Sequence, residues 1–81
     1  MNYVYVLKSS TRIYIGRTSK LKERINEHFK RKTWTTRRFK KLELIFYEAF
    51  KDKIDSIRRE RYFKTSKGKS SLKQIIRESL K

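Results

Sequence analysis

The sequence YIGRTSKLKERINEH, residues 14–28, joins the end of a predicted strand to a predicted helix. Gly16 closes the strand. Apolar residues then recur every four positions, the spacing of one helix face, at Leu21, Ile25 and Phe29. Arg24 and His28, the only histidine of the chain, border this stripe and share a face of the helix because they lie four residues apart. The run thus gathers Tyr14, an arginine and a histidine, a set that indicates chemistry on phosphate.

Upstream of this run, alternating residues predict a β-hairpin. Strands are expected over residues 3–7 and 12–16, with Ser9-Ser10 between them. The favoured register places Tyr5 opposite Tyr14 on one face. The same register places four aliphatic residues on the other face, namely Val4, Val6, Ile13 and Ile15.

Downstream, a third strand is predicted over residues 42–50, with apolar residues on both faces. One face would carry Leu42, Leu44, Phe46 and Phe50, and the other Ile45, Tyr47 and Ala49. Helices are therefore expected on both sides of the sheet. Asp52 or Asp55 can cap a helix over about residues 53–66 that ends at Gly68, and Ser70 or Ser71 can open a last helix. The prediction is one α+β domain over residues 1–81, with a small three-stranded antiparallel sheet flanked by helices in the order β-β-α-β-α-α.

The charge of the chain points to a polyanionic partner. The 81 residues include 24 Lys and Arg against 8 Asp and Glu, a net charge of +16. Nucleic acid is the partner expected first. An anionic membrane surface comes second, because the basic residues are spread along the whole chain. No apolar run is long enough for a membrane span, and the expected location is the cytoplasm.

The absence of cysteine and the single histidine limit the metal chemistry. Cys-ligated zinc and His-pair sites are excluded, so any metal must be held by oxygen, which favours ions such as Mg²⁺. Glu60 is the most diagnostic acid, because Ile57 and Phe63 flank it three residues away on either side and place it near the buried face of its helix. It can hold a divalent ion beside a phosphodiester, or it can simply pair with Lys64 or a neighbouring arginine.

The other candidates also have ordinary structural explanations. Tyr5 and Tyr14 can be strand aromatics that pack on a helix, or phenols that orient water or phosphate. Arg24 and His28 can be a solvated charge and a structural histidine, or a phosphate fork and a proton relay. Further residues are expected to contact nucleic acid, with Trp34 able to stack on a base: Gly16, Arg17, Lys20, Trp34, Arg37, Arg38, Lys64 and Lys67.

Together these motifs resemble the GIY-YIG nuclease family, in particular its small stand-alone members. Tyr3-Val4-Tyr5 stands at the first family motif, and Tyr14-Ile15-Gly16 matches the second. Arg24, His28 and Glu60 then follow in the family order. The resemblance covers roughly residues 2–76. Tyr3 replaces the glycine of the family name. No asparagine follows Glu60, so Lys67 or Ser66 would have to replace the late asparagine of the family, or activity would be weak.

The resemblance implies hydrolysis of phosphodiester bonds with one divalent ion, Mg²⁺ or Mn²⁺. Tyr5 would be the general base or a water-orienting phenol, and Tyr14 would orient water or metal ligands. Arg24 would stabilise charge on the phosphoryl group, His28 would assist by hydrogen bonding or proton transfer, and Glu60 would hold the metal. These five side chains are expected to line one concave face.

The resulting hypothesis is a metal-dependent DNA endonuclease or nickase that recognises DNA structure or simply the backbone. It would act as a monomer or weak dimer, with any sequence specificity supplied by a protein partner. Two alternatives remain open: a non-catalytic DNA- or RNA-binding module that kept the fold, and a structural protein of an RNA–protein particle.

Overall fold

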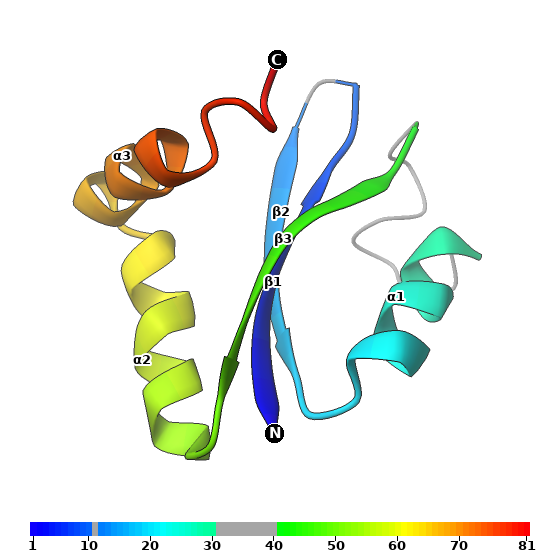
Figure 1. Ribbon diagram of the computed structural model, residues 1–81, viewed down its shortest axis with the longest axis vertical. Helices are drawn as coiled ribbons and strands as arrows, with labels where there is room; N and C mark the ends of the chain where they lie inside the picture. Colours follow the sequence, from blue (N-terminus) through cyan, green and yellow to red (C-terminus); the bar gives the residue numbers. More distant parts are fainter. Residues whose placement is uncertain (11, 31–40) are drawn as a thin grey trace.

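In the computed structural model, which describes residues 1–10, 12–30 and 41–81, a small sheet lies between two helical layers (Figure 1). The elements are β1 (Asn2–Lys8), β2 (Ile13–Thr18), α1 (Leu21–Phe29), β3 (Glu43–Phe50), α2 (Lys53–Phe63) and α3 (Ser66–Ile75). Helix α1 covers one face of the sheet, and α2 with α3 covers the other. The α+β class, the element order and the helices on both faces are as predicted. In the described residues no helix is long and apolar enough to cross a membrane.

Strand β1 is the centre of the molecule. The strand order is β2-β1-β3 and both pairings are antiparallel. Residues 4–7 of β1 are each no more than 1% exposed. Val4 and Val6 pack with Phe63 of α2 and Leu72 of α3 in one core. Because side chains alternate along a strand, the intervening residues of β1 enter the second core, against α1, with Ile25 at its centre.

The predicted hairpin register is wrong by two residues. Tyr5 lies opposite Gly16, and Tyr14 lies opposite Leu7. The two tyrosines are therefore diagonal neighbours on the same face, so the prediction that they share a face is confirmed. The hairpin closes one residue later than predicted, between Ser9 and Arg12: the Ser9 amide donates to the Arg12 carbonyl at 2.8 Å, and the Arg12 amide donates to Ser9 Oγ at 2.9 Å.

Strand β3 does not keep a single alternation. A register irregularity lies between Val6 and Leu7 of β1: Val6 pairs with Phe46, but Leu7 pairs with Leu44. The extra residue reverses the faces of β3, as a β-bulge does. Leu44 packs in the α1 core and Phe46 in the opposite core. The prediction that Leu42, Leu44, Phe46 and Phe50 share one face is therefore wrong.

The helices also depart from the predicted boundaries. Asp52 caps α2 as expected, accepting a hydrogen bond from the Ile54 amide at 2.8 Å. However, Gly68 does not end α2: it lies inside α3, whose N-cap Thr65 accepts from the Gly68 amide at 3.0 Å. Phe29 was expected in the apolar stripe of α1, yet it is 46% exposed.

Gly68 allows α3 to turn closely onto the end of α2. A Cβ atom on Gly68 would lie 1.7 Å from the carbonyl oxygen of Tyr62 and 3.0 Å from Cα of Phe63. These are backbone atoms, which cannot move aside as the end of a flexible side chain can. The glycine is therefore required by close packing between two helices.

We expect Gly68→Ala to destabilise the fold by roughly 1–3 kcal/mol or more, because the methyl group overpacks a backbone contact. Urea unfolding followed by circular dichroism measures the change. Lys67→Ala, on the exposed neighbouring position, is the matched control and should stay within about 0.5 kcal/mol of the parent. Equal midpoints for the Gly68→Ala variant and the parent would contradict the packing role.

Candidate active site

The hydroxyl of Tyr5 is the centre of a polar cluster between the sheet and α1. It lies 2.7 Å from Nε2 of His28, and both side chains are almost fully buried, with 1% and 0% exposure. Arg24 of α1 lies near the same hydroxyl, where its positive charge opposes the effect of burial on the pKa of Tyr5. Strand β1 supplies the tyrosine and α1 supplies its two partners. The packing of α1 on the sheet thus brings a residue of the first strand to the end of the run over residues 14–28.

Tyr14 of β2 completes the cluster. Its ring centroid lies 5.1 Å from that of His28 and 6.3 Å from that of Tyr5. Unlike those two residues, Tyr14 is half-buried, as is Arg24, whose side chain is 35% exposed. Tyr14 and Arg24 are therefore the members of the cluster that can reach a substrate directly, and Tyr5 and His28 support them from behind.

Gly16 makes room for the phenol of Tyr5. A Cβ atom at this position would lie 2.4 Å from the Tyr5 hydroxyl oxygen and 3.0 Å from the ring of Tyr14. Gly16 itself is buried. The structure thus gives this glycine an internal packing role, and its contact with a nucleic-acid backbone stays a prediction.

Burial keeps the two innermost groups neutral. It raises the pKa of Tyr5 to about 12, with the nearby Arg24 guanidinium opposing the shift. Burial also lowers the pKa of His28, and the nearby positive charge of Arg24 lowers it further. The Tyr5 hydroxyl and Nε2 of His28 share a hydrogen bond whose donor depends on the imidazole tautomer. Near neutral pH the pair is therefore a phenol hydrogen-bonded to a neutral imidazole.

Glu60 lies on the other side of β2 from this cluster. Its Oε1 is 3.7 Å from Nε of Arg17, and its Oε2 is 3.1 Å from Nζ of Lys64. Arg17 follows Gly16 directly, so its side chain projects from the face opposite the tyrosines. Within the described residues, no hydrogen bond or ion pair joins Glu60 to Tyr5 or Tyr14.

The environment of Glu60 fits the expectation from its helix position, since its side chain is only 21% exposed. The contact with Arg17 has no sequence signal, because the two residues are far apart in the chain and are joined only by the packing of α2 on β2. Nε of Arg17 is itself buried and has no hydrogen-bond partner in the described residues. The Arg17–Glu60–Lys64 group is therefore a charged cluster in which one cation is incompletely satisfied.

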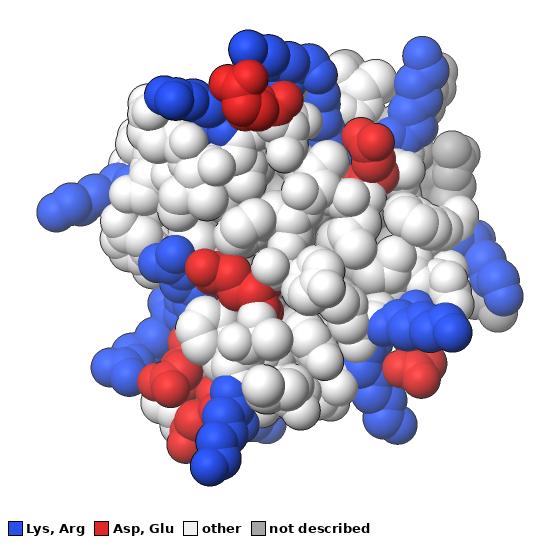
Figure 2. All heavy atoms as spheres, viewed as in Figure 1, with Lys and Arg blue, Asp and Glu red and all other residues white. Residues whose placement is uncertain are grey.

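The residues expected to contact nucleic acid are distributed over the surface. Lys20 and Lys67 are exposed, whereas Lys64 and Arg17 are held by Glu60. Figure 2 shows basic side chains around the periphery of one face, with acidic side chains beside them. Trp34, Arg37 and Arg38 lie outside the described residues.

A family model described as the GIY-YIG catalytic domain matches residues 1–74 of the 81-residue chain. Neither curated proteins nor solved structures give a significant match. The matched range contains the whole Tyr5 cluster and Glu60.

The neutral state of His28 should make stability depend on pH. Its pKa is lowered by folding from an ordinary value of 6.5, so near this pH the unfolded chain binds more protons than the folded chain. We expect the free energy of unfolding to fall as the pH drops from about 7 to about 5. His28 is the only histidine, so His28→Gln should flatten this dependence, as urea midpoints would report. An identical pH slope in the variant would contradict the buried neutral imidazole.

Proposed function

The chain belongs to the GIY-YIG catalytic domain family, and from that premise we propose that it is an endonuclease that hydrolyses phosphodiester bonds of DNA. The observation that carries this proposal is the Tyr5–His28–Arg24–Tyr14 cluster. It combines a cation, two phenols and a neutral base beside Gly16. The net charge of +16 suits a substrate with a phosphate backbone.

Arg24 is the group we expect to contact the phosphate. Its guanidinium is partly exposed, and Tyr5 and Glu27 hold it, with Nη1 3.4 Å from Oε2 of Glu27. A guanidinium held in this way can fork onto two phosphoryl oxygens and stabilise the charge that develops there. Tyr14, beside it, can orient the attacking water through its phenol.

The buried pair supplies a route for the proton. As the oxygen of water bonds to phosphorus and the bond to the leaving oxygen breaks, the water must lose a proton. Tyr5 cannot act as a standing phenolate near neutral pH, because burial raises its pKa to about 12. It can pass its own proton to Nε2 of neutral His28 while it accepts the proton that the attacking water loses. We therefore assign Tyr5 and His28 to a relay behind Tyr14.

Glu60 is the residue that would hold a divalent cation. In the described residues no three acidic or histidine side chains gather around a common point, so any metal would rest on this one carboxylate, water and substrate oxygens. Mg²⁺ and Mn²⁺ accept such a set, and the oxygen donor fits them. The ion, when bound, would supply positive charge beside the phosphate. Arg17 and Lys64 already occupy the carboxylate, so binding must displace or share these contacts.

Non-catalytic binding of DNA or RNA is the alternative that the charge also supports. A structural protein of an RNA–protein particle would also use the positive charge to bind the phosphate backbone. Neither alternative requires Tyr14, Arg24 or Glu60 in any chemical role. A cleavage assay therefore distinguishes the endonuclease from the two binding functions, whereas the salt dependence of binding does not.

We expect Arg24→Ala to slow cleavage of supercoiled or branched DNA in Mg²⁺ by roughly 10²–10³, because one charge-stabilising donor is lost. Arg58→Ala is the matched control, because the Arg58 side chain is 76% exposed and pairs with Asp55 of the same helix. Its rate should equal that of the parent. If the parent protein binds all of these DNAs but cuts none in Mg²⁺ or Mn²⁺, the endonuclease proposal is wrong.

Glu60→Gln should abolish metal-dependent cleavage while DNA binding stays the same or tightens, because a negative charge is removed near Arg17 and Lys64. Gel-shift titration in EDTA measures binding apart from cleavage. Glu23→Gln, at an exposed position of α1, controls for the change in net charge. Full cleavage by the Glu60→Gln variant would rule out the metal assignment.

A further inference from the structure

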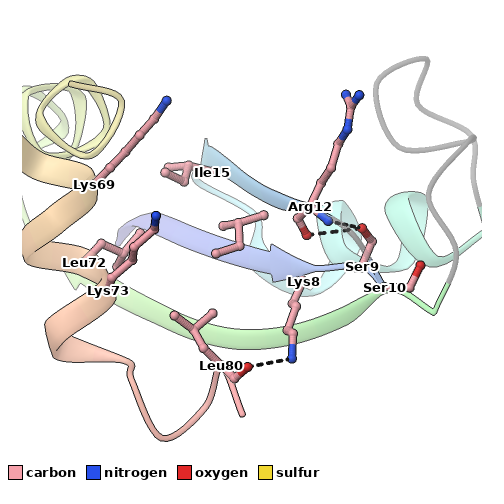
Figure 3. A pocket seen from close by; sticks show the side chains of 10 residues that line it. Lys8, Ser9, Ser10, Arg12, Ile15, Lys69, Leu72, Lys73 and Leu80 are labelled. Carbon is pink, nitrogen blue, oxygen red and sulfur yellow. Dashed lines mark hydrogen bonds between the residues drawn. The ribbon is translucent and has the colours of Figure 1, made fainter. Parts of the chain in front are cut away.

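A cleft of about 410 Å³ lies between the end of the β1–β2 hairpin and α3, on the face of the sheet opposite the tyrosines (Figure 3). None of the residues proposed for catalysis lines it. Its volume falls within the range of small-ligand sites in proteins. The cleft is therefore a second concave site, for which the endonuclease proposal has no use.

The rim of the cleft is cationic. Lys8 and Arg12 contribute from the hairpin, and Lys69 and Lys73 from α3 (Figure 3). Among the residues that the structure describes, no acidic side chain lines the cleft or forms an ion pair with any of the four. Lys8 donates to the carbonyl oxygen of Leu80 at 3.1 Å, which fixes that ammonium group at the rim. Four cations without a protein counter-ion form a site for phosphate groups.

The floor of the cleft is apolar. Ile13 and Ile15 of β2 and Leu72 of α3 form it. Ile15 and Leu72 belong to the buried core, whereas Ile13 is 37% exposed. A ligand that matches both rim and floor combines anionic groups with an apolar surface, as a nucleotide does with its phosphates and its base. An acidic peptide offers the first without the second, and a paired duplex keeps its bases inside the stack.

The cleft is also placed to receive a strand that leaves the candidate active site. β2 is an edge strand of the sheet, so a polymer can pass over its edge. Ile13 and Ile15 alternate with Tyr14 along it, so the cleft floor and the tyrosine cluster lie on the two sides of one strand.

We propose that this cleft binds an unpaired nucleotide of single-stranded nucleic acid, with its phosphates on the four cations and its base on the aliphatic floor. The inference rests on the proposed function, because the nucleotide would flank the bond that is cut. It predicts a preference for substrates with an unpaired segment, such as branched DNA, over fully paired DNA.

Fluorescence anisotropy tests the proposal with a short labelled oligothymidylate and a matched blunt duplex, both in EDTA so that neither is cut. Lys69→Gln combined with Lys73→Gln should weaken single-strand binding roughly tenfold and reduce the slope of log K against log salt by about 1.4, or 0.7 per phosphate contact. Duplex binding should weaken much less. Lys51→Gln combined with Lys53→Gln removes the same charge from exposed positions near the start of α2, at the other end of the molecule, and is the control (Figure 1). If both double variants weaken binding alike, net charge alone explains it and the site is ruled out.

The base is tested separately from the phosphates. Ile13→Ser, at a partly exposed position, should weaken binding of oligothymidylate but not of an abasic strand of the same length. An unchanged ratio between these two ligands would overturn the base pocket. If the proposed function is wrong, the parent chain will not cleave DNA. That result does not affect the binding measurements, which are made in EDTA.

Discussion

Burial of both faces of β1 is the constraint on which the rest of the structure depends. Residues 4–7 are each at most 1% exposed, so successive side chains must enter opposite cores. Val4 and Val6 hold α2 and α3 against one face, and Leu7 with Tyr5 holds α1 against the other. Because Tyr5 is part of a core and also carries a hydroxyl, its polar group must be satisfied inside the protein. The hydrogen bond to His28 satisfies it, so the same burial that stabilises the fold builds the candidate site.

The positions of acidic residues offset part of the high positive charge of the chain. Self-repulsion at +16 opposes folding, and a chain of 81 residues has only a thin core to offset it. Two partly buried acidic residues pair with cations: Glu48 accepts two hydrogen bonds from Arg59, at 2.8 and 3.2 Å, and Glu60 lies between Arg17 and Lys64. The cations of the hairpin–α3 cleft have no such partner in the described part of the chain. The unpaired positive charge that remains is what a polyanion can neutralise.

The candidate site divides between two sides of an edge strand. Tyr14 faces the buried Tyr5–His28 pair, Arg17 faces Glu60, and Gly16 between them admits the phenol of Tyr5. For catalysis as proposed, substrate must contact both sides at this edge. In the described residues, Glu60 has no direct contact with the four side chains of the Tyr5 cluster, although all five were expected to line one concave face. The metal role of Glu60 is a proposal.

Sequence periodicity determined the element order, the antiparallel sheet with helices on both faces, and the placement of Tyr5 and Tyr14 on one face, because alternation and helical spacing are local properties. The family match over residues 1–74 agrees with the family that the motifs resemble. The pairing of Tyr5 with Gly16, the bulge that sends Leu44 and Phe46 to different cores, and the place of Gly68 inside α3 were decided by tertiary structure. Each depends on a contact between segments whose relative positions no local pattern fixes. The burial of His28 and the partnership of Arg17 with Glu60 arose in the same way, from the packing of helices on the two faces of β1 and β2.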